Sequence, residues 1–187
     1  MKMPSHPQTQ PVTKSSNPWR GAAQTIVLSL ILAGGARQVL AEPRYIPTES
    51  MRPTLEVNDR ILVEKLSYRW SDPKRGDLIV FNPPAVLGSQ VKDAFVKRII
   101  GLPGDRIEIK SGHVYVNQQI LSEPYLKEAP QYQMATIVIP PDQYFVLGDN
   151  RNNSYDSHFW GTVPRENIIG RAIVRTYPFD RLGTIWD

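Results

Sequence analysis

Short β-type segments separated by Pro, Gly, Asn and Asp occupy the chain from residue 44 onward, and this pattern restricts the fold more than any other feature. Several segments alternate apolar and polar residues and are rich in Val and Ile, which is typical of half-buried strands. No long helical period interrupts them, and the 17 prolines of the chain argue against long helices. The sequence therefore predicts a mainly β fold. The candidate strands are 60–64, 77–81, 94–100, 106–110, 113–117, 136–139, 144–147 and 171–177, with a hairpin at 106–117.

An apolar segment precedes these strands. Residues 21–36 carry no charge, and the segment reaches the length of about 20 residues that a membrane-spanning helix needs only if it continues past Arg37 to residue 41. A buried core helix is one alternative, but the segment is apolar on every face. A cleavable signal peptide is another, because Val39-Leu40-Ala41 has the small-residue pattern of a cleavage site. We favour an uncleaved anchor.

The charges around this segment indicate its orientation. Three positive charges precede it and two follow it closely, which favours an N-terminus in the cytoplasm. Residues 1–18 are rich in Pro, Ser, Gln and Thr and show no apolar periodicity. The predicted organisation is a disordered cytoplasmic tail at 1–20, a transmembrane anchor at 21–41 and an extracytoplasmic β-rich domain at 42–187.

Composition excludes several classes of function. The chain has no cysteine, which rules out thiol proteases, disulfide frameworks and thiolate metal sites. With only three histidines, a zinc site built on several imidazoles is not expected. The net charge of +4 is spread along the chain without a basic run interleaved with aromatic residues, so nucleic-acid binding is not expected. An anionic membrane surface suits this charge. We expect neither a metal nor a cofactor.

A serine flanked by two prolines follows the apolar segment. Pro47 and Pro53 stiffen the chain around Ser50, because proline fixes its own φ and pushes the preceding residue towards an extended conformation. A stiff segment can hold a nucleophile at a set angle. Taken alone, the segment is more simply explained as a Pro-rich linker between helix and domain.

Two cations lie in the strand predicted at 94–100. Lys97 and Arg98 point to opposite faces, and both faces are otherwise apolar. Arginine cannot act as a base, because its pKa exceeds about 12, whereas a desolvated lysine can lose several pKa units. Lys97 is therefore the candidate general base, and Arg98 is assigned a structural role. The alternative is an edge-strand lysine that extends into solvent.

A loop dense in hydrogen-bonding side chains, residues 148–158, follows the strand at 144–147. A solvated loop would explain this composition, but not its closure by Phe159-Trp160-Gly161, which should anchor the loop to a core. Such loops on rigid scaffolds often orient catalytic groups. Asn152-Asn153-Ser154 also matches a glycosylation sequon, which we attribute to chance in so Asn-rich a stretch.

Three motifs summarise these segments: Ser-Met-x-Pro-Thr-Leu at 50–55, Lys-Arg-x-x-Gly-x-Pro-Gly-Asp at 97–105, and Gly-Asp-Asn-Arg-x-Asn-Ser-x-Asp-Ser at 148–157. In this order and spacing the chain resembles the type I signal peptidases (leader peptidases), over about residues 22–180. The run Glu42–Pro47 looks most like the cyanobacterial and thylakoid-processing branch of that family.

The resemblance implies a fold and an activity. The fold would be a domain of antiparallel sheets and a small barrel, preceded by one N-terminal transmembrane helix. The activity would be that of a membrane-bound serine endopeptidase, which removes N-terminal signal peptides from secreted or translocated preproteins through an acyl-enzyme intermediate. The enzyme would sit in the plasma membrane, or alternatively the thylakoid membrane, with its N-terminus in the cytoplasm and its catalytic domain on the outer face. Its partners would be preprotein signal peptides and membrane lipids.

The resemblance also assigns roles to residues. Ser50 would attack the scissile carbonyl and Lys97 would take its proton. The Ser50 backbone N–H and the Thr48 hydroxyl would form the oxyanion hole. Ser154 would orient the lysine amine, and Asp156 would support the loop. Small substrate residues at the first and third positions before the cut would fit pockets lined by Ile46, Pro47, Met51, Leu55, Phe95 and Val96.

Two positions depart from the family pattern, and two rival functions compete with this assignment. Asn152 stands where many relatives carry Asp, and His158 where well-known bacterial members carry Arg. A pairing of Asp156 with His158 would be weaker or would depend on imidazole protonation. A Ser-His-Asp hydrolase using these two residues is the enzymatic rival, but it leaves the Lys97 motif unexplained. A non-catalytic, membrane-tethered β domain that binds a partner is the other rival, and the presence of both Ser50 and Lys97 argues against it.

Overall fold

The computed structural model describes residues 19, 23, 25–27, 29, 40–88, 91 and 93–185. The chain divides into two units, residues 1–37 and 38–187. Within the described part of the chain, no helix is long and apolar enough to cross a bilayer. The tail expected at 1–20 and the anchor expected at 21–41 lie mostly outside the described residues.

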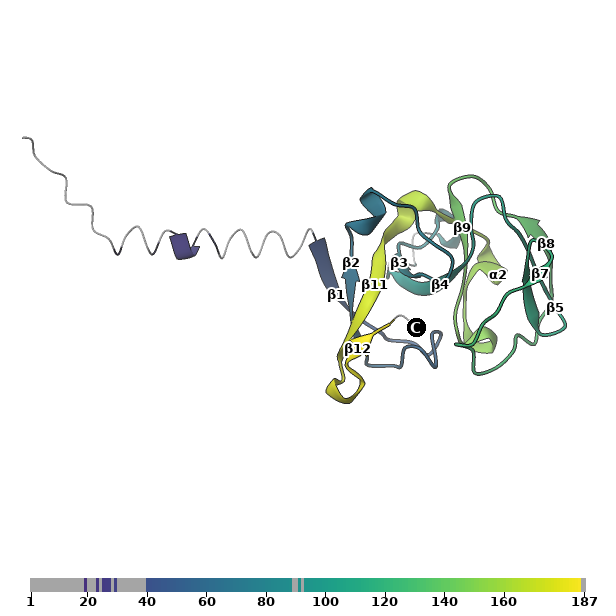
Figure 1. Ribbon diagram of the computed structural model, residues 1–187. Helices are drawn as coiled ribbons and strands as arrows, with labels where there is room; N and C mark the ends of the chain where they lie inside the picture. Colours follow the sequence, from purple (N-terminus) through teal and green to yellow (C-terminus); the bar gives the residue numbers. More distant parts are fainter. Residues whose placement is uncertain are drawn as a thin grey trace, which may run out of the picture. The chain divides into compact units, whose positions relative to one another are not determined.

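The second unit consists of two antiparallel sheets, which lie side by side in Figure 1. The larger sheet has eight strands in the order β1-β2-β11-β3-β4-β9-β10, with β12 beside β11. Its strands are Ala41–Tyr45 (β1), Arg60–Glu64 (β2), Leu78–Phe81 (β3), Phe95–Gly101 (β4), Gln143–Leu147 (β9), Val163–Pro164 (β10), Ile168–Tyr177 (β11) and Gly183–Thr184 (β12).

The smaller sheet has four strands in the order β7-β6-β5-β8. They are Arg106–Lys110 (β5), His113–Val116 (β6), Gln119–Ile120 (β7) and Met134–Val138 (β8). Short helices connect strands at Ser67–Arg69 (η1), Ala85–Leu87 (η2), Arg151–Asn153 (η3), Ser157–Trp160 (α2), Arg165–Asn167 (η4) and Phe179–Arg181 (η5).

The predicted mainly β, antiparallel fold is confirmed. The strands at the two ends of the larger sheet, β1 and β10, are not paired with one another in the described part of the chain. The larger sheet is therefore open within the described residues and does not form the closed small barrel expected from the family resemblance.

Strands β3, β4 and β9 lie in the middle of the larger sheet, which explains their unbroken apolar sequences. All four residues of β3 are buried, and β3 pairs with β11 on one side and β4 on the other. A strand covered on both faces needs apolar residues at successive positions instead of alternate ones. The two cations of β4 are thereby held in a buried strand.

Three apolar clusters make up the core. One packs the two sheets together, with Ile100 and Leu147 from the larger sheet against Ile107 and Val114 from the smaller one. A second lies on the alternate face of β3, β4 and β9 and includes Trp160. The third joins β2, β3 and β11 to the segment after β1: it contains Ile46, Met51, Leu55, Ile61, Val63, Leu78, Val80, Ala172 and Ile185.

Four strands were not predicted from the sequence: β1, β7, β10 and β12. The last three contain two residues each, too few to show an alternating pattern. β1 contains Pro43, but it is an end strand of the sheet, where a missing N–H costs no inner ladder bond. Ala41, taken as the last residue of the anchor, is the first residue of β1 and pairs with Glu64.

Candidate active site

Ser50 lies in the turn that connects β1 to β2. The backbone N–H of Asn58 donates to the carbonyl of Ile46 at 2.9 Å and closes the base of this turn. The side chains of Met51 and Leu55 are 1% and 0% exposed and hold the turn against the core. Ser50 itself is 9% exposed and lies at the wall of a cleft.

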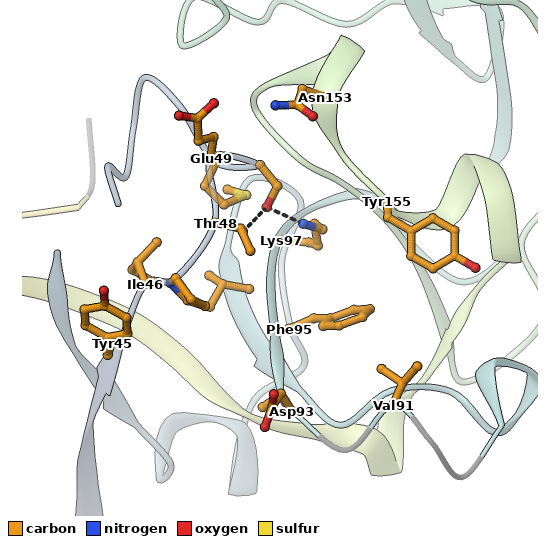
Figure 2. A pocket seen from close by; sticks show the side chains of 15 residues that line it. Tyr45, Ile46, Thr48, Glu49, Val91, Asp93, Phe95, Lys97, Asn153 and Tyr155 are labelled. Atoms are coloured by element: carbon orange, nitrogen blue, oxygen red, sulfur yellow. Dashed lines mark hydrogen bonds between the residues drawn. The ribbon is translucent and has the colours of Figure 1, made fainter. Parts of the chain in front are cut away.

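Lys97 reaches Ser50 from β4. In the register of the sheet, Lys97 is opposite Ile79 of β3. Its Nζ lies 2.6 Å from Ser50 Oγ, within hydrogen-bond distance, although 47 positions separate the two residues. Figure 2 shows this bond together with the one from Ser50 to Thr48. The geometry joins a hydroxyl and an amine as a nucleophile and base would be joined.

The environment of Lys97 favours its neutral form. Burial lowers the pKa of the Lys97 amine to about 8, because the ammonium form loses its hydration. The carboxylates of Asp156 and Asp149 act in the opposite direction by stabilising the ammonium form, and burial outweighs them. A substantial fraction of the amine is therefore unprotonated in mildly alkaline solution.

Arg98 points to the other face of β4 and neutralises a buried carboxylate. Its Nε and Nη2 donate to the two oxygens of Asp149 at 2.8 and 2.7 Å. The guanidinium also lies 3.9 Å from the ring centroid of Tyr125, and Thr54 donates its hydroxyl to Asp149. Arg98 thus ties the strand that carries Lys97 to the loop at 148–158 and to the segment after Ser50.

Thr48 lies beside Ser50. Its Oγ1 is 3.2 Å from Ser50 Oγ, and either hydroxyl can donate in this pair. Thr48 is exposed, whereas Ser50 is buried. Because Thr48 lines the cleft, its hydroxyl can face the cleft while it stays close to Ser50 Oγ.

The loop at 148–158, here called the polar loop, meets the turn that connects β1 to β2 through contacts with its backbone. The N–H of Asn150 donates to the carbonyl of Ser50 at 3.0 Å, and the Asn150 side chain donates to the carbonyl of Glu49 at 3.2 Å. Behind this contact, the fully buried Asp156 carboxylate accepts from the N–H of Gly148 at 2.9 Å. Asp156 is thus bonded to the backbone at the start of the loop from the protein interior.

Ser154 lies beside the turn that carries Ser50. Its side chain is buried, and its hydroxyl makes no hydrogen bond with the described residues. A Cβ built on Gly148 would lie 2.2 Å from Ser154 Oγ and 2.4 Å from the carbonyl oxygen of Ser50. Glycine is therefore required at position 148 to let the hydroxyl and this carbonyl approach. The bond expected from Ser154 to the Lys97 amine is not formed.

His158 is bonded to Asp156 and not to Ser50. Its Nδ1 lies 2.8 Å from Asp156 Oδ1, and its ring stacks on Tyr132 with centroids 4.0 Å apart. The hydrogen bonds of Ser50 Oγ go to Lys97 and Thr48. The Asp-His part of the rival triad is thus formed, but the imidazole does not meet the serine.

A cleft of about 710 Å³ opens in front of Ser50 and Lys97 (Figure 2). Five of the six residues expected to line the substrate pockets line it: Ile46, Pro47, Met51, Phe95 and Val96. Leu55 does not, and this assignment was wrong, because Leu55 is fully buried among core residues beneath the turn.

Other residues of the cleft were not found from the sequence. They are Tyr45, Glu49, Val91, Asp93, Ala94, Asn153 and Tyr155. Asn153 and Tyr155 lie within the third motif, and the others shortly precede the first or the second, so position relative to a motif was the available signal. Within the described residues, no group of three or more His, Asp or Glu side chains is placed to hold a metal ion.

A serine hydroxyl bonded to a buried lysine in an open cleft is the arrangement that a serine endopeptidase with a lysine base would need. Residues 19–177 match the family model described as "Signal peptidase, peptidase S26", and the chain belongs to this family. More narrowly, it is a type I signal peptidase of the cyanobacterial and thylakoid branch, and hence a serine endopeptidase.

Three relatives illustrate this placement. The chain is 52% identical to "Signal peptidase I" of Leptolyngbya laminosa, over 97% of this chain and 93% of that protein. It is 53% identical to "Probable signal peptidase I-2" of Synechocystis, over 91% of this chain and 79% of that protein. It is 42% identical to "Thylakoidal processing peptidase 1, chloroplastic" of Arabidopsis thaliana, over 76% of this chain and 44% of that longer protein.

Proposed function

We propose that this protein is a membrane-bound signal peptidase that cleaves N-terminal signal peptides from secreted or translocated preproteins, with Ser50 as nucleophile and Lys97 as general base. The observation that carries the proposal is the 2.6 Å contact between Ser50 Oγ and Lys97 Nζ inside the cleft. Its chemical support is the lowered pKa of Lys97, which makes the amine a usable base.

The reaction follows from this contact. The neutral Lys97 amine takes the proton of Ser50 Oγ while the oxygen attacks the scissile carbonyl carbon, and the carbonyl oxygen becomes an oxyanion. The Lys97 ammonium then gives the proton to the departing amine, the C–N bond breaks and an acyl-enzyme ester remains. The Lys97 amine then takes a proton from water, whose oxygen attacks the ester carbon. The bond from this carbon to Ser50 Oγ breaks, and the Lys97 ammonium gives the proton to Ser50 Oγ.

Two donors are available for the oxyanion. The Thr48 hydroxyl is 3.2 Å from Ser50 Oγ. The Ser50 N–H belongs to the peptide unit between Glu49 and Ser50, and the Asn150 side chain donates to the carbonyl of this unit at 3.2 Å. Because a peptide unit is planar, holding the Glu49 carbonyl towards Asn150 also fixes the direction of the Ser50 N–H. Donors fixed before the reaction stabilise the transition state without reorganisation.

The cleft suits an extended peptide with small side chains. In β4, Phe95–Lys97 pair with β3 on one side, whereas pairing with β9 begins at Arg98. The other edge of β4 at 95–97 can therefore accept a substrate strand by β-augmentation. The facing wall consists of Ile46 and Pro47. These apolar walls favour small residues at the first and third positions before the cut.

A membrane location is part of the proposal. It rests on the apolar segment at 21–41 and on the relationship to thylakoidal and cyanobacterial enzymes. The native protein should stay with the membrane fraction after a carbonate wash and should retain residues 1–41. A soluble protein with a mature N-terminus at Glu42 would contradict the anchor and support a cleavable signal peptide.

The activity is tested with the purified full chain in detergent. A preprotein with a known signal sequence is incubated with the enzyme, and the mass of each product locates the cut bond. A single cut after a small residue is expected for the parent protein and no cut for Ser50→Ala. Cleavage that persists in Ser50→Ala, or an intact preprotein with the parent enzyme, would reject the proposal.

A further inference from the structure

A chain of contacts leads from His158 through Asp156 and Gly148 to the carbonyl of Ser50. The imidazole itself is bonded to Asp156, not to Ser50 or Lys97. His158 Nδ1 lies 2.8 Å from Asp156 Oδ1, and the side chains are 11% and 0% exposed. The other carboxylate oxygen, Oδ2, accepts from the Gly148 N–H at 2.9 Å. Gly148 in turn is packed between Ser154 and the Ser50 carbonyl.

The imidazole of His158 is held in one orientation. The Tyr132 ring stacks on it with an interplanar angle of 14°, and the Phe159 ring lies 3.8 Å from it between centroids. The backbone N–H of His158 also donates to Asp156 Oδ1, at 3.2 Å. The titratable groups in contact with the imidazole are thus the Asp156 carboxylate and the Tyr132 phenol.

Asp156 is the link to the lysine amine. Its carboxylate is fully buried and stands first among the charges that raise the pKa of Lys97. Interactions between charges in such an environment are weakly screened by solvent and salt. Any positive charge that is bonded to Asp156 therefore offsets part of its effect on Lys97.

We infer that His158 is a positioning residue for the proposed reaction: acting through Asp156, it sets how readily Lys97 gives up its proton. A neutral imidazole holds the carboxylate in place and leaves its negative charge to act on the amine. A protonated imidazole holds it in the same place and neutralises that charge, which favours the neutral, basic form of Lys97. The inference deepens the proposed function and rests on it.

Two substitutions separate the bond from the charge. His158→Asn keeps a short neutral donor for Asp156, and His158→Arg supplies a donor with a permanent positive charge. The full chain in detergent is used, and kcat/KM for one preprotein is measured from pH 6 to pH 10. The midpoint of the acidic limb should be about 0.5–1 pH unit lower in His158→Arg than in His158→Asn.

A second measurement does not depend on turnover. The NMR signal of the 13Cε-labelled Lys97 side chain, assigned with Lys97→Arg, is titrated in the same variants. The Lys97 midpoint should show the same difference between His158→Arg and His158→Asn. In an Asp156→Asn background the difference should vanish, because the charge that transmits it is gone. Far-UV circular dichroism and the Tm establish that each variant is folded; His158→Lys replaces His158→Arg if the arginine variant unfolds.

Equal Lys97 midpoints in the charged and uncharged variants would overturn the inference. A difference that persists in Asp156→Asn would overturn it too, because the effect would then bypass Asp156. These outcomes are distinct from a failure of the proposed function, which would appear as cleavage by Lys97→Ala.

Discussion

The backbone N–H of Asn150 donates to the carbonyl oxygen of Ser50 at 3.0 Å. This bond fixes the peptide unit between Ser50 and Met51 from a loop that is distant in the sequence. The Asn150 side chain adds a second bond to the carbonyl of Glu49, 101 positions earlier in the chain. Lys97 of strand β4 is bonded to the same serine, so β4, the turn after β1 and the loop after β9 all meet at Ser50. Substitutions in each of these three segments should therefore have measurable effects.

Removing either member of the Ser50–Lys97 pair should abolish cleavage. Ser50→Ala removes the nucleophile and Lys97→Ala the base, so each should lower kcat/KM by at least about 10³-fold while the far-UV circular dichroism is unchanged. His113→Ala, on the exposed edge of β6, is the matched surface control. His158→Ala should keep measurable activity. Activity lost in His158→Ala but kept in Lys97→Ala would instead support a histidine-based triad.

The Thr48 hydroxyl should stabilise the oxyanion. Thr48→Val preserves the shape of the side chain and removes the donor, and loss of one such donor lowers kcat by about 10²–10³-fold. Thr48→Ser restores the hydroxyl and should recover much of the rate. The comparison is made at saturating substrate, so that kcat is separated from binding. A valine variant as fast as the parent would mean that Thr48 only spaces Pro47 from Ser50.

The pH profile should show an acidic limb set by Lys97. The base must be neutral, and burial lowers the pKa of Lys97 to about 8. Below that pH the ammonium form predominates, so log kcat/KM should fall by about one for each pH unit. Above it, activity should level off in the mildly alkaline range. A limb near pH 10.4, the value for an exposed lysine, would show that the amine is not desolvated in solution.

Lys97 should lower the stability of the fold. Its folded pKa of about 8 lies below the ordinary lysine value of 10.5, so the unfolded chain holds more protons between these two pH values. The free energy of unfolding of the parent should therefore rise with pH across this window. Lys97→Met removes the buried cation and should be more stable by about 1–3 kcal/mol at pH 7. Urea unfolding at pH 7 and pH 10 should show this gain shrinking as the pH rises; a constant difference would refute the argument.

Gly148 should tolerate no side chain. A Cβ at this position would lie 2.2 Å from Ser154 Oγ and 2.4 Å from the Ser50 carbonyl oxygen, so the loop or the turn that carries Ser50 must move. A displacement of about 1 Å at a reacting group can cost 10²-fold in rate, and Gly148→Ala should lose at least that. Gly183→Ala is the matched control, because nothing lies within 4 Å of its added Cβ. Equal kcat/KM in the two variants would show that the contact is not needed for catalysis.

The sequence by itself predicted the fold class, the family and the two residues that we propose to react. Runs rich in Val and Ile predicted eight of the strands within a few residues. A strand with one buried face alternates apolar and polar residues, and a strand covered on both faces is apolar throughout, so both kinds leave a local pattern. The chemistry of the side chains was sufficient to prefer Lys97 over Arg98 as a base, and the motifs were sufficient to identify the family. Strands of two residues and an end strand with a proline left no such local pattern.

Only the tertiary structure decided which of these residues meet. Lys97 and Arg98 point to opposite faces because they are consecutive in β4. The neighbours on each face, Ser50 for one and Asp149 for the other, come from distant segments and are set by the packing of whole elements. Leu55 shows the same limit: its apolar character fits a substrate pocket as well as a core, and its place beneath the turn assigns it to the core. His158 is bonded to Asp156, two positions away, but only the packing of the loop decides that its imidazole does not meet Ser50. Contacts between distant segments depend on how whole elements pack, and no local pattern of residues records that packing.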